Sequence, residues 1–525
     1  MTSPANPDEI IEQFGGCGRF QIMINVASHA MKTVVCFSIM SMVIISRTPP
    51  WWCNDEVALN NMTSCVAFEN GTEIFRCPEK TCSINGTKCS SFGYNKRTLV
   101  SEFNLVCDLD YIPSFIMSLQ VAGTLVGNVM AGHVAEYIGR KKPFFFSVAI
   151  FVVFNLFGYF STNWIMFTVV RVFIGLAAGV FMTSTYSLLC EFSSAKWRVW
   201  IIGFPSWPIE ACIFALIAWL VQDWRHLQLL IALVGIPCLL PWFIIPESFR
   251  WYIAHDKLEQ AKEIIHKVAA FNKREISNLT ELMTSQPTTD PDSKKYSLVD
   301  LFRTRKLTRI TLLSSMNWFA LGIVSYGISF GIQSLSGNIY LNFFLFSIVG
   351  IPSKVIALWL QNRIGRRGTT MLCHLLVIIG GFAVGIIEGM DIDNKGAMIN
   401  GFAQLANIGI TTAWGSVQTM TIELYPTVIR PIGFGTLSVV GRIGAIIGPQ
   451  LVYVNLQKPG LMYYVLGGVS TICLLGCLGL PETKNANLND KIQTKSNIVS
   501  PEIKPQKLDT NGHNNEKKVV ENTIV

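Results

Sequence analysis

The chain has 525 residues, of which 50% are hydrophobic and only 14% are charged, and it carries a formal net charge of +8. Such a composition excludes a soluble globular protein with an ordinary surface and predicts an integral membrane protein. The positive charges are spread over several loops, so they are a poor match to the gathered basic surface of a nucleic-acid-binding domain.

Twelve apolar stretches follow one another along the chain, and each is close to the length of about 20 residues that crosses a bilayer as a helix. The first is too long for a signal-peptide core and no small-residue cleavage site follows it, so we expect it to remain as a span. The stretches predict an all-α membrane protein and lie near residues 20–46, 111–131, 144–161, 164–189, 199–221, 227–245, 311–330, 339–361, 369–388, 397–421, 431–454 and 462–480.

Three short phrases occur twice in the chain, in the same order, which indicates an internal duplication. In a hydrophobic chain, two parallel halves related by an axis along the membrane normal are typical of a transporter. We therefore expect six helices in an N-terminal half, 20–245, and six in a C-terminal half, 311–480. The phrases are Ile138-Gly-Arg-Lys141 and Ile364-Gly-Arg-Arg367, Glu191 with Arg198 and Glu423 with Arg430, and Pro246-Glu-Ser248 and Pro481-Glu-Thr483.

Basic residues predict the orientation in the membrane. The connector 246–310 carries twelve Lys or Arg, whereas the links around 161–163 and 331–338 carry none. The positive-inside rule makes the connector cytoplasmic, and an even number of spans also makes the segments 1–19 and 481–525 cytoplasmic. The first loop, 47–110, is then extracellular, and we expect the protein in the plasma membrane.

The first loop contains an even set of cysteines and three glycosylation sequons, at Asn61, Asn70 and Asn85. In an oxidising compartment six cysteines predict three disulfides, although fifteen pairings are possible. A zinc site is the alternative, but the loop contains no His. The cysteines are Cys53, Cys65, Cys77, Cys82, Cys89 and Cys107.

Several motifs resemble the major facilitator superfamily and, within it, the organic cation, organic anion and carnitine transporter family (solute carrier family 22). The superfamily resemblance rests on Arg171-x3-Gly175-x3-Gly179, a spacing that lets two membrane helices approach closely. The narrower resemblance covers about residues 12–484 and rests on Gly16-Cys-Gly-Arg-Phe-Gln21, the cysteine-rich loop, Glu102-Phe-Asn-Leu-Val-Cys107, Pro246-Glu-Ser-Phe-Arg-Trp251, Glu423 to Arg430 and Leu480-Pro-Glu-Thr483.

The resemblance implies a cytoplasmic gate between the halves. The family's Asp-Arg pair reads Glu136-Tyr137 in the first copy and Asn362-Arg363 in the second, so each half keeps one charged member. A simpler interpretation of the same loops is that their basic residues only fix topology. The expected gate residues are Glu136, Gly139, Arg140, Lys141, Arg171, Glu191, Arg198, Arg366, Glu423 and Arg430. For Arg171 a structural role is the favoured interpretation, since its motif belongs to the whole superfamily.

Besides Arg171, four charged residues lie well inside predicted spans, where each costs about 2.5–3.5 kcal/mol unless it has a partner or a cavity. They are Lys32, Glu210, Lys354 and Arg442. By resemblance, Arg442 stands where organic anion and carnitine members carry Arg and organic cation members carry Asp. Lys354 matches a Lys of organic anion transporters. The net positive set favours an anionic or carboxylate-bearing substrate; the alternatives are a cation transporter using Glu210, or a structural pair of Glu210 with a lysine.

Aromatic and amide side chains supply the remaining candidates for substrate contacts. Trp318 and Tyr326 share a face of the seventh span and could stack on an organic ion or contact its cationic part. Gln418, in the tenth span, offers a neutral hydrogen bond. The same rings could instead form an interfacial belt.

No phosphate-binding Gly-rich loop and no metal-ligand spacing is present, so the sequence predicts no enzyme, no cofactor and no metal. It favours alternating access of a small organic ion, with or without a counter-transported ion. A non-transporting receptor or scaffold is the alternative. The tail ends Thr523-Ile-Val525, a form that PDZ domains capture as an added strand, although a free end without a partner is the simpler interpretation.

Overall fold

The structure is a computed structural model that describes residues 7–13, 16–53, 66–69, 72–75, 80, 82–84, 87–194, 196–197, 204–274, 297–426 and 428–484. Several predictions concern residues outside this part of the chain. They are the sequons at Asn61, Asn70 and Asn85, the cysteines Cys65 and Cys77, the gate residue Arg198, and the terminal Thr523–Val525.

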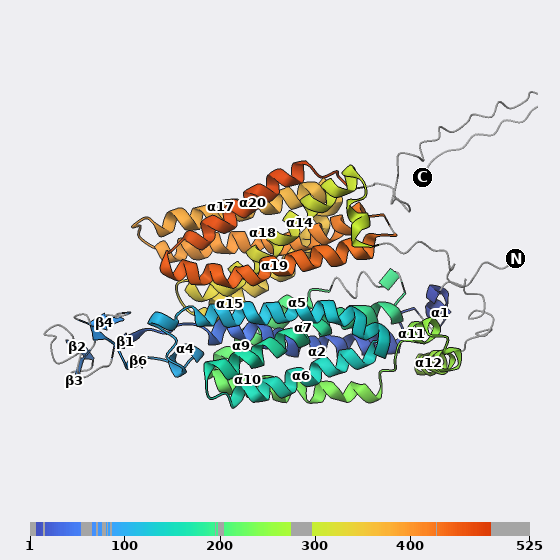
Figure 1. Ribbon diagram of the computed structural model, residues 1–525, viewed down its shortest axis with the longest axis horizontal. Helices are drawn as coiled ribbons and strands as arrows, with labels where there is room; N and C mark the ends of the chain where they lie inside the picture. Colours follow the sequence, from blue (N-terminus) through green and yellow to red (C-terminus); the bar gives the residue numbers. More distant parts are fainter. Residues whose placement is uncertain are drawn as a thin grey trace, which may run out of the picture.

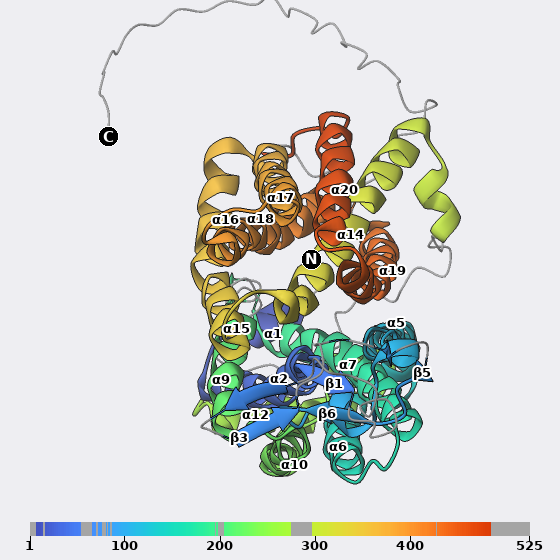
Figure 2. The same ribbon diagram turned by 90° about the vertical axis from the view of Figure 1, so that its left-hand side faces the viewer.

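Two helical bundles lie side by side, one above the other in Figure 1 and facing the viewer end-on in Figure 2. The first bundle contains α2 (Arg19–Ile45), α5 (Ile112–Ile138), α6 (Lys141–Tyr159), α7 (Trp164–Phe192), α9 (Ser206–Val221) and α10 (Trp224–Gly235), which η2 (Pro237–Phe243) continues. The second contains α14 (Arg305–Gly331) with η4 (Ile332–Ser334), α15 (Ile339–Ile348) continued by α16 (Gly350–Ile364), α17 (Arg366–Glu388), α18 (Lys395–Leu424), α19 (Arg430–Gln457) and α20 (Leu461–Leu478).

Ten spans in the described part are long and apolar enough to cross a membrane. The helix α9 is a shorter apolar helix of 16 residues, and α18 has 30 residues. With these two, the described residues are consistent with six membrane passes in each bundle. The predicted all-α membrane fold of two halves is confirmed. The helices run past several predicted ends: α5 continues to Ile138 and α14 begins at Arg305, because an apolar stretch marks the bilayer core while a helix continues into polar surroundings.

Close backbone contact builds the first bundle. A Cβ atom on Gly175 of α7 would lie 1.9 Å from the backbone oxygen of Gln120 in α5, and one on Gly179 would lie 2.3 Å from that of Thr124. No other residue fits such a contact. The small-residue spacing noted in the sequence is therefore the place where α5 and α7 meet.

The outer loop forms a small extension at the left of Figure 1. It contains three two-stranded antiparallel pairs, α4 (Leu99–Glu102) and η1 (Cys107–Leu109). The strands are β1 (Trp51–Cys53) with β6 (Phe92–Tyr94), β2 (Val66–Glu69) with β3 (Thr72–Phe75), and β4 (Ser83–Ile84) with β5 (Thr87–Lys88).

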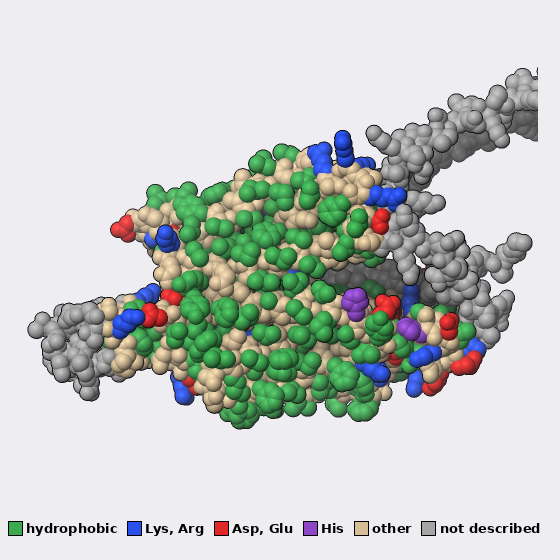
Figure 3. Space-filling model, in the orientation of Figure 1, with side chains coloured by type: hydrophobic (Ala, Val, Ile, Leu, Met, Phe, Trp, Pro, Cys, Tyr) green, Lys and Arg blue, Asp and Glu red, His purple; other side chains and the backbone are tan. Residues whose placement is uncertain are grey.

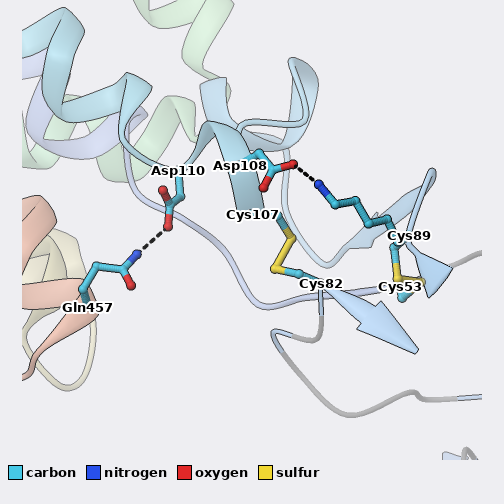
Figure 4. The surroundings of a disulfide bond; sticks show 8 residues. Cys53, Cys82, Cys89, Cys107, Asp108, Asp110 and Gln457 are labelled. Carbon is cyan, nitrogen blue, oxygen red and sulfur yellow. Dashed lines mark hydrogen bonds and ion pairs between the residues drawn. A yellow bond between two sulfur atoms is a disulfide. The ribbon is translucent and has the colours of Figure 1, made fainter. Parts of the chain in front are cut away.

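Two disulfides hold this loop, Cys53–Cys89 and Cys82–Cys107 (Figure 4). The disulfide prediction is thus confirmed for the four loop cysteines that the structure describes. Cys107 lies directly before α5, so its bond fixes the loop to the bundle. Glu102 adds a second attachment, because its carboxylate accepts hydrogen bonds from Trp224 Nε1 at 2.7 Å and Arg225 Nε at 2.8 Å.

The halves are joined toward the side that carries this loop. Gln450 Nε2 of α19 donates to Ser118 Oγ of α5 at 2.9 Å, and Ser118 Oγ donates to the backbone oxygen of Ile446 at 2.7 Å. Gln457 donates to Asp110 at 2.7 Å (Figure 4). At the opposite end the surface is hollowed between the bundles (Figure 3). The helices α1 (Pro7–Gln13), α11 (Phe249–Ala254) and α12 (Leu258–Phe271) lie at this end (Figure 1), and η3 (Leu298–Phe302) precedes α14.

Candidate substrate-binding site

A cavity of about 310 Å³ lies between the two halves. The C-terminal half contributes side chains from α14, α16, α18 and α19, and the N-terminal half contributes from α2, α5, α7 and α9. Two cationic residues, Lys354 and Arg442, line it, and no Asp or Glu is found among its lining residues in the described part of the chain. The cavity is therefore positively charged.

Arg442 reaches the cavity from α19. A Cβ atom on Gly448 would lie 2.8 Å from the Cβ of Tyr326. The helices α19 and α14 are therefore in close contact about one and a half turns beyond Arg442. This contact brings Arg442 Nη1 within 3.0 Å of the Tyr326 hydroxyl oxygen, to which it donates a hydrogen bond. Tyr326 thereby orients the guanidinium while leaving its other donors for a ligand.

Lys354 reaches the cavity from the first turns of α16. The eighth span is interrupted at Val349, which lies between the end of α15 at Ile348 and the start of α16 at Gly350. A Cβ atom on Gly350 would meet Pro208 of α9 at 2.8 Å, so the break lies against the opposite half. Among the described residues, Lys354 forms no ion pair and is available to a ligand.

Aromatic rings form much of the remaining wall. Trp414 of α18 donates from Nε1 to Ser325 Oγ at 2.7 Å, and the rings of Tyr326 and Phe330 are 5.8 Å apart. Trp207 of α9 lies on the wall formed by the N-terminal half. Sequence reasoning did not identify Trp207, because a Trp next to a Pro in an apolar span carries no signal of the face it occupies.

Two predicted contacts do not line this cavity. Trp318 is buried behind Trp414, with ring centroids 6.1 Å apart, and donates from Nε1 to Thr421 Oγ1 at 2.9 Å. Gln418 lies one turn from Trp414 along α18 and is absent from the lining. The spacing of Trp318 and Tyr326 along one helix predicted a shared face, but the facing helix determines which residues of that face reach the cavity.

Lys32 and Glu210 form a separate group within the N-terminal half. Lys32 Nζ donates to Ser206 Oγ at 2.6 Å, and His29 Nδ1 lies 4.0 Å from Glu210 Oε1. Lys32 and His29 line a second, much smaller cavity of about 20 Å³. Neither Lys32 nor Glu210 lines the cavity that holds Lys354 and Arg442.

The duplicated phrases come together, in each half, at the end that lies away from the cysteine-rich loop. In the first, Arg140 Nε is 3.0 Å from Glu191 Oε1, and Glu247 Oε1 accepts from the backbone N–H groups of Arg140 at 2.7 Å and Lys141 at 3.0 Å. The Glu247 carboxylate thus supplies hydrogen-bond acceptors for the first backbone N–H groups of α6, which have no partners within the helix. Gly139 permits this approach with φ +94°.

The second half repeats this arrangement. Arg366 Nη2 is 2.9 Å from Glu423 Oε1, and Glu482 accepts from the backbone N–H groups of Arg366 at 2.8 Å and Arg367 at 3.1 Å. Burial alone would raise the pKa of Glu482, but the backbone donors lower that pKa below its ordinary value. The sequence repeats pointed to Glu247 and Glu482, yet their helix-capping role required the structure.

The other gate candidates lie apart from this unit. The side chain of Glu136 is exposed, and Arg430 Nε donates to the Tyr425 backbone oxygen at 3.3 Å. Arg171 is fully buried within the N-terminal half, where it donates to the Ser38 backbone oxygen at 2.8 Å.

Comparison with known proteins establishes the family. A family model described as sugar (and other) transporter matches residues 87–493. Solute carrier family 22 member 4 of Mus musculus is 30% identical over 532 residues, covering 94% of this chain and 95% of that protein. The chain belongs to solute carrier family 22. It is therefore a membrane transporter of the major facilitator superfamily and not an enzyme, as the motifs predicted.

Other relatives agree with this assignment. Organic cation/carnitine transporter 2 of Rattus norvegicus is 30% identical and covers 92% of this chain and 93% of its own length. Solute carrier family 22 member 7 of Mus musculus is 26% identical, with coverage of 96% and 99%. Among solved structures, the inward open conformation of the xylose transporter XylE from E. coli has a TM-score of 0.61 at 13% identity, covering 89% of this chain and 98% of that one. That likeness supports the fold.

Proposed function

We propose that this protein carries small organic anions, or zwitterions bearing a carboxylate such as carnitine, across the plasma membrane by alternating access. The observation that carries the proposal is that Lys354 and Arg442 line the same cavity, whose described lining contains no acidic side chain. A cation inside the membrane needs a partner. A carboxylate on the substrate supplies it.

The geometry suits a carboxylate. A guanidinium binds a carboxylate through two parallel N–H donors, and a hydrogen bond to a charged group contributes about 1.5–3 kcal/mol. Because one nitrogen of Arg442 is occupied by Tyr326, the guanidinium is held in place before the substrate arrives. Lys354, a point charge from a different helix, adds attraction without fixing orientation.

The aromatic wall extends the proposal to zwitterions. A quaternary ammonium binds over the face of an aromatic ring by cation–π attraction. Trp207, Tyr326 and Trp414 are the rings on this wall that could receive it. The name of one relative, organic cation/carnitine transporter 2, is consistent with such a substrate.

The two halves are suited to move as rigid units about this cavity. The ion pairs Arg140–Glu191 and Arg366–Glu423 each lie within one half, so rocking of one half against the other leaves both intact. We assign these pairs, with Glu136, Gly139 and Lys141, to the cytoplasmic gate region.

The second candidate is transport of organic cations, which the name of a Drosophila melanogaster relative, organic cation transporter-like protein, brings forward. That function would require an acidic partner. Glu210 is the acid predicted for it, and Glu210 is absent from the cavity lining.

Uptake by purified, reconstituted protein tests the proposal, with labelled carnitine, aromatic monocarboxylates and quaternary ammonium ions as substrates. Arg442→Gln should lower anion uptake by about tenfold to a hundredfold, the factor that corresponds to the loss of one charged hydrogen bond. Lys458→Gln removes an exposed charge just beyond the same helix and should have no effect. Unchanged anion uptake by Arg442→Gln would refute the assignment, and binding without uptake by the wild type would indicate a receptor.

A further inference from the structure

Glu210 in α9 is an acidic side chain buried in the membrane without the hydrogen bonds that stabilise an ionised carboxylate. The residue as a whole is 4% exposed, and among the described residues no group donates a hydrogen bond of normal geometry to either carboxylate oxygen. The groups that act on it are Lys32, through its charge, and Ser206, one turn earlier on α9. A buried carboxylate with so few hydrogen-bond donors destabilises the fold, and its presence indicates a functional role.

His29 is the second member of this group. Its Nδ1 lies 4.0 Å from Glu210 Oε1, and neither ring nitrogen is hydrogen bonded. The His29 side chain is 26% exposed whereas that of Glu210 is 6% exposed, and His29 borders the small cavity of about 20 Å³. A histidine can gain and lose a proton near neutral pH. His29 is therefore placed to pass a proton between the protein surface and Glu210.

The surroundings of Glu210 contain no other acid in the described part of the chain. The helix α9 packs against α2, α10, α15 and α16. From α10, Arg225 is bound to Glu102 at the outer end, and from α15, Tyr340 lies near Arg47 there. The titratable groups closer to Glu210 are His29, Lys32 and Cys36 of α2, Cys212 of α9 and Lys354 of α16.

These neighbours favour a proton over a metal cation. Calcium and magnesium need several oxygen ligands, whereas the polar neighbours here include the Lys32 ammonium, which would repel a metal cation. Glu210 does not line the cavity that holds Lys354 and Arg442, which also argues against direct substrate contact. A proton requires only one oxygen.

We propose that Glu210 is a proton-binding site, loaded through His29, that couples inward proton movement to the transport of organic anions proposed above. The proton adds to a Glu210 oxygen from water on one side of the membrane and returns to water on the other. One proton moving with one monovalent anion carries no net charge. The proposal rests on the proposed function for its substrate.

Lys32 provides the coupling between the two sites. Its charge acts on both Glu210 and Lys354. While Glu210 is ionised, it offsets the charge of Lys32. When Glu210 takes up a proton, Lys32 is left uncompensated beside Lys354, so the cavity attracts an anion more strongly. By linkage, a bound anion must strengthen proton binding at Glu210 by the same factor.

Reconstituted vesicles can separate coupling from transport itself. Net uptake of a labelled aromatic monocarboxylate is measured with and without an inward proton gradient, alongside exchange of labelled for unlabelled substrate at equal pH. For one-to-one coupling, each unit of pH gradient should give about tenfold accumulation in the wild type. Glu210→Gln should abolish gradient-driven accumulation and retain exchange. Glu259→Gln, a change at an exposed acid on α12, should behave as the wild type.

The outcomes are distinguishable. Exchange without any response to the gradient in the wild type would overturn the coupling proposal and leave the proposed function standing. Loss of exchange as well as accumulation in a folded Glu210→Gln variant would also overturn it, because Glu210 would then serve the substrate site or the fold. If that variant does not fold, a pH-sensitive dye inside wild-type vesicles decides: proton entry with the substrate supports the proposal, and no proton entry overturns it.

Discussion

Gly139 and Glu247 are in such close contact that a Cβ atom on the glycine would lie 2.1 Å from Oε2 of the glutamate. The same relationship joins Gly365 and Glu482 in the other half, at 2.5 Å. In each half a carboxylate thus caps the helix that follows a glycine with positive φ, beside an Arg–Glu ion pair.

Gly139→Ala should destabilise the cytoplasmic end of the N-terminal half. Its φ of +94° and the contact with Glu247 both oppose a side chain, and such strain costs about 1–3 kcal/mol. We expect a lower melting temperature of the purified protein and slower transport. The matched control is Gly132→Ala in α5, where a Cβ would meet nothing within 4 Å; equal effects of both changes would contradict this explanation.

Glu482→Gln should reveal a pH-dependent contribution to stability. The pKa of Glu482 is lowered in the folded protein, so its stabilising effect is present above the unfolded value of about 4.3 and is lost as pH falls through the lower folded value. The difference in melting temperature between wild type and variant should therefore be largest at neutral pH and shrink under acidic conditions. A difference that grows on acidification would show that the sign is wrong.

Tyr326→Phe should weaken substrate binding without abolishing transport. The change removes the hydroxyl that accepts from Arg442 at 3.0 Å, a contribution of about 0.5–1.5 kcal/mol, or roughly twofold to tenfold. We expect a higher KM for anions with kcat little changed. Tyr464→Phe alters an exposed tyrosine of α20 and serves as the control; a fall in kcat alone would argue against an orienting role.

The outer loop should resist alkylation in intact, unreduced cells. Cys53, Cys82, Cys89 and Cys107 are paired, so a membrane-impermeant maleimide should label them only after reduction. Enzymatic deglycosylation should also lower the apparent mass if Asn61, Asn70 and Asn85 carry glycan outside the cell. Labelling of these four cysteines without reduction would contradict the pairing, and an absence of labelling after reduction would contradict the orientation.

The sequence predicted the membrane passes and the two halves because bilayer thickness and internal duplication both leave direct signals in a chain. It also singled out Lys354, Arg442 and Tyr326, which the structure brings to one cavity, because ionisable residues in apolar spans are rare. It also grouped Lys32 and Glu210 with them, whereas the structure places these two outside the lining of that cavity. Helical periodicity gives the face of a helix, but the choice of facing helix depends on packing across the whole bundle. Trp207 left no signal for the same reason.

On the side of the cysteine-rich loop the two halves are joined along a seam made largely of neutral hydrogen bonds, such as those of Gln450 and Ser118. Each neutral bond contributes only about 0.5–1.5 kcal/mol. A ligand shifts a conformational equilibrium by no more than its difference in affinity for the two states. Because the seam is weak, a small organic ion with one or two good contacts has enough differential affinity to part it, and the strong ion pairs, confined within each half, need never break during the cycle.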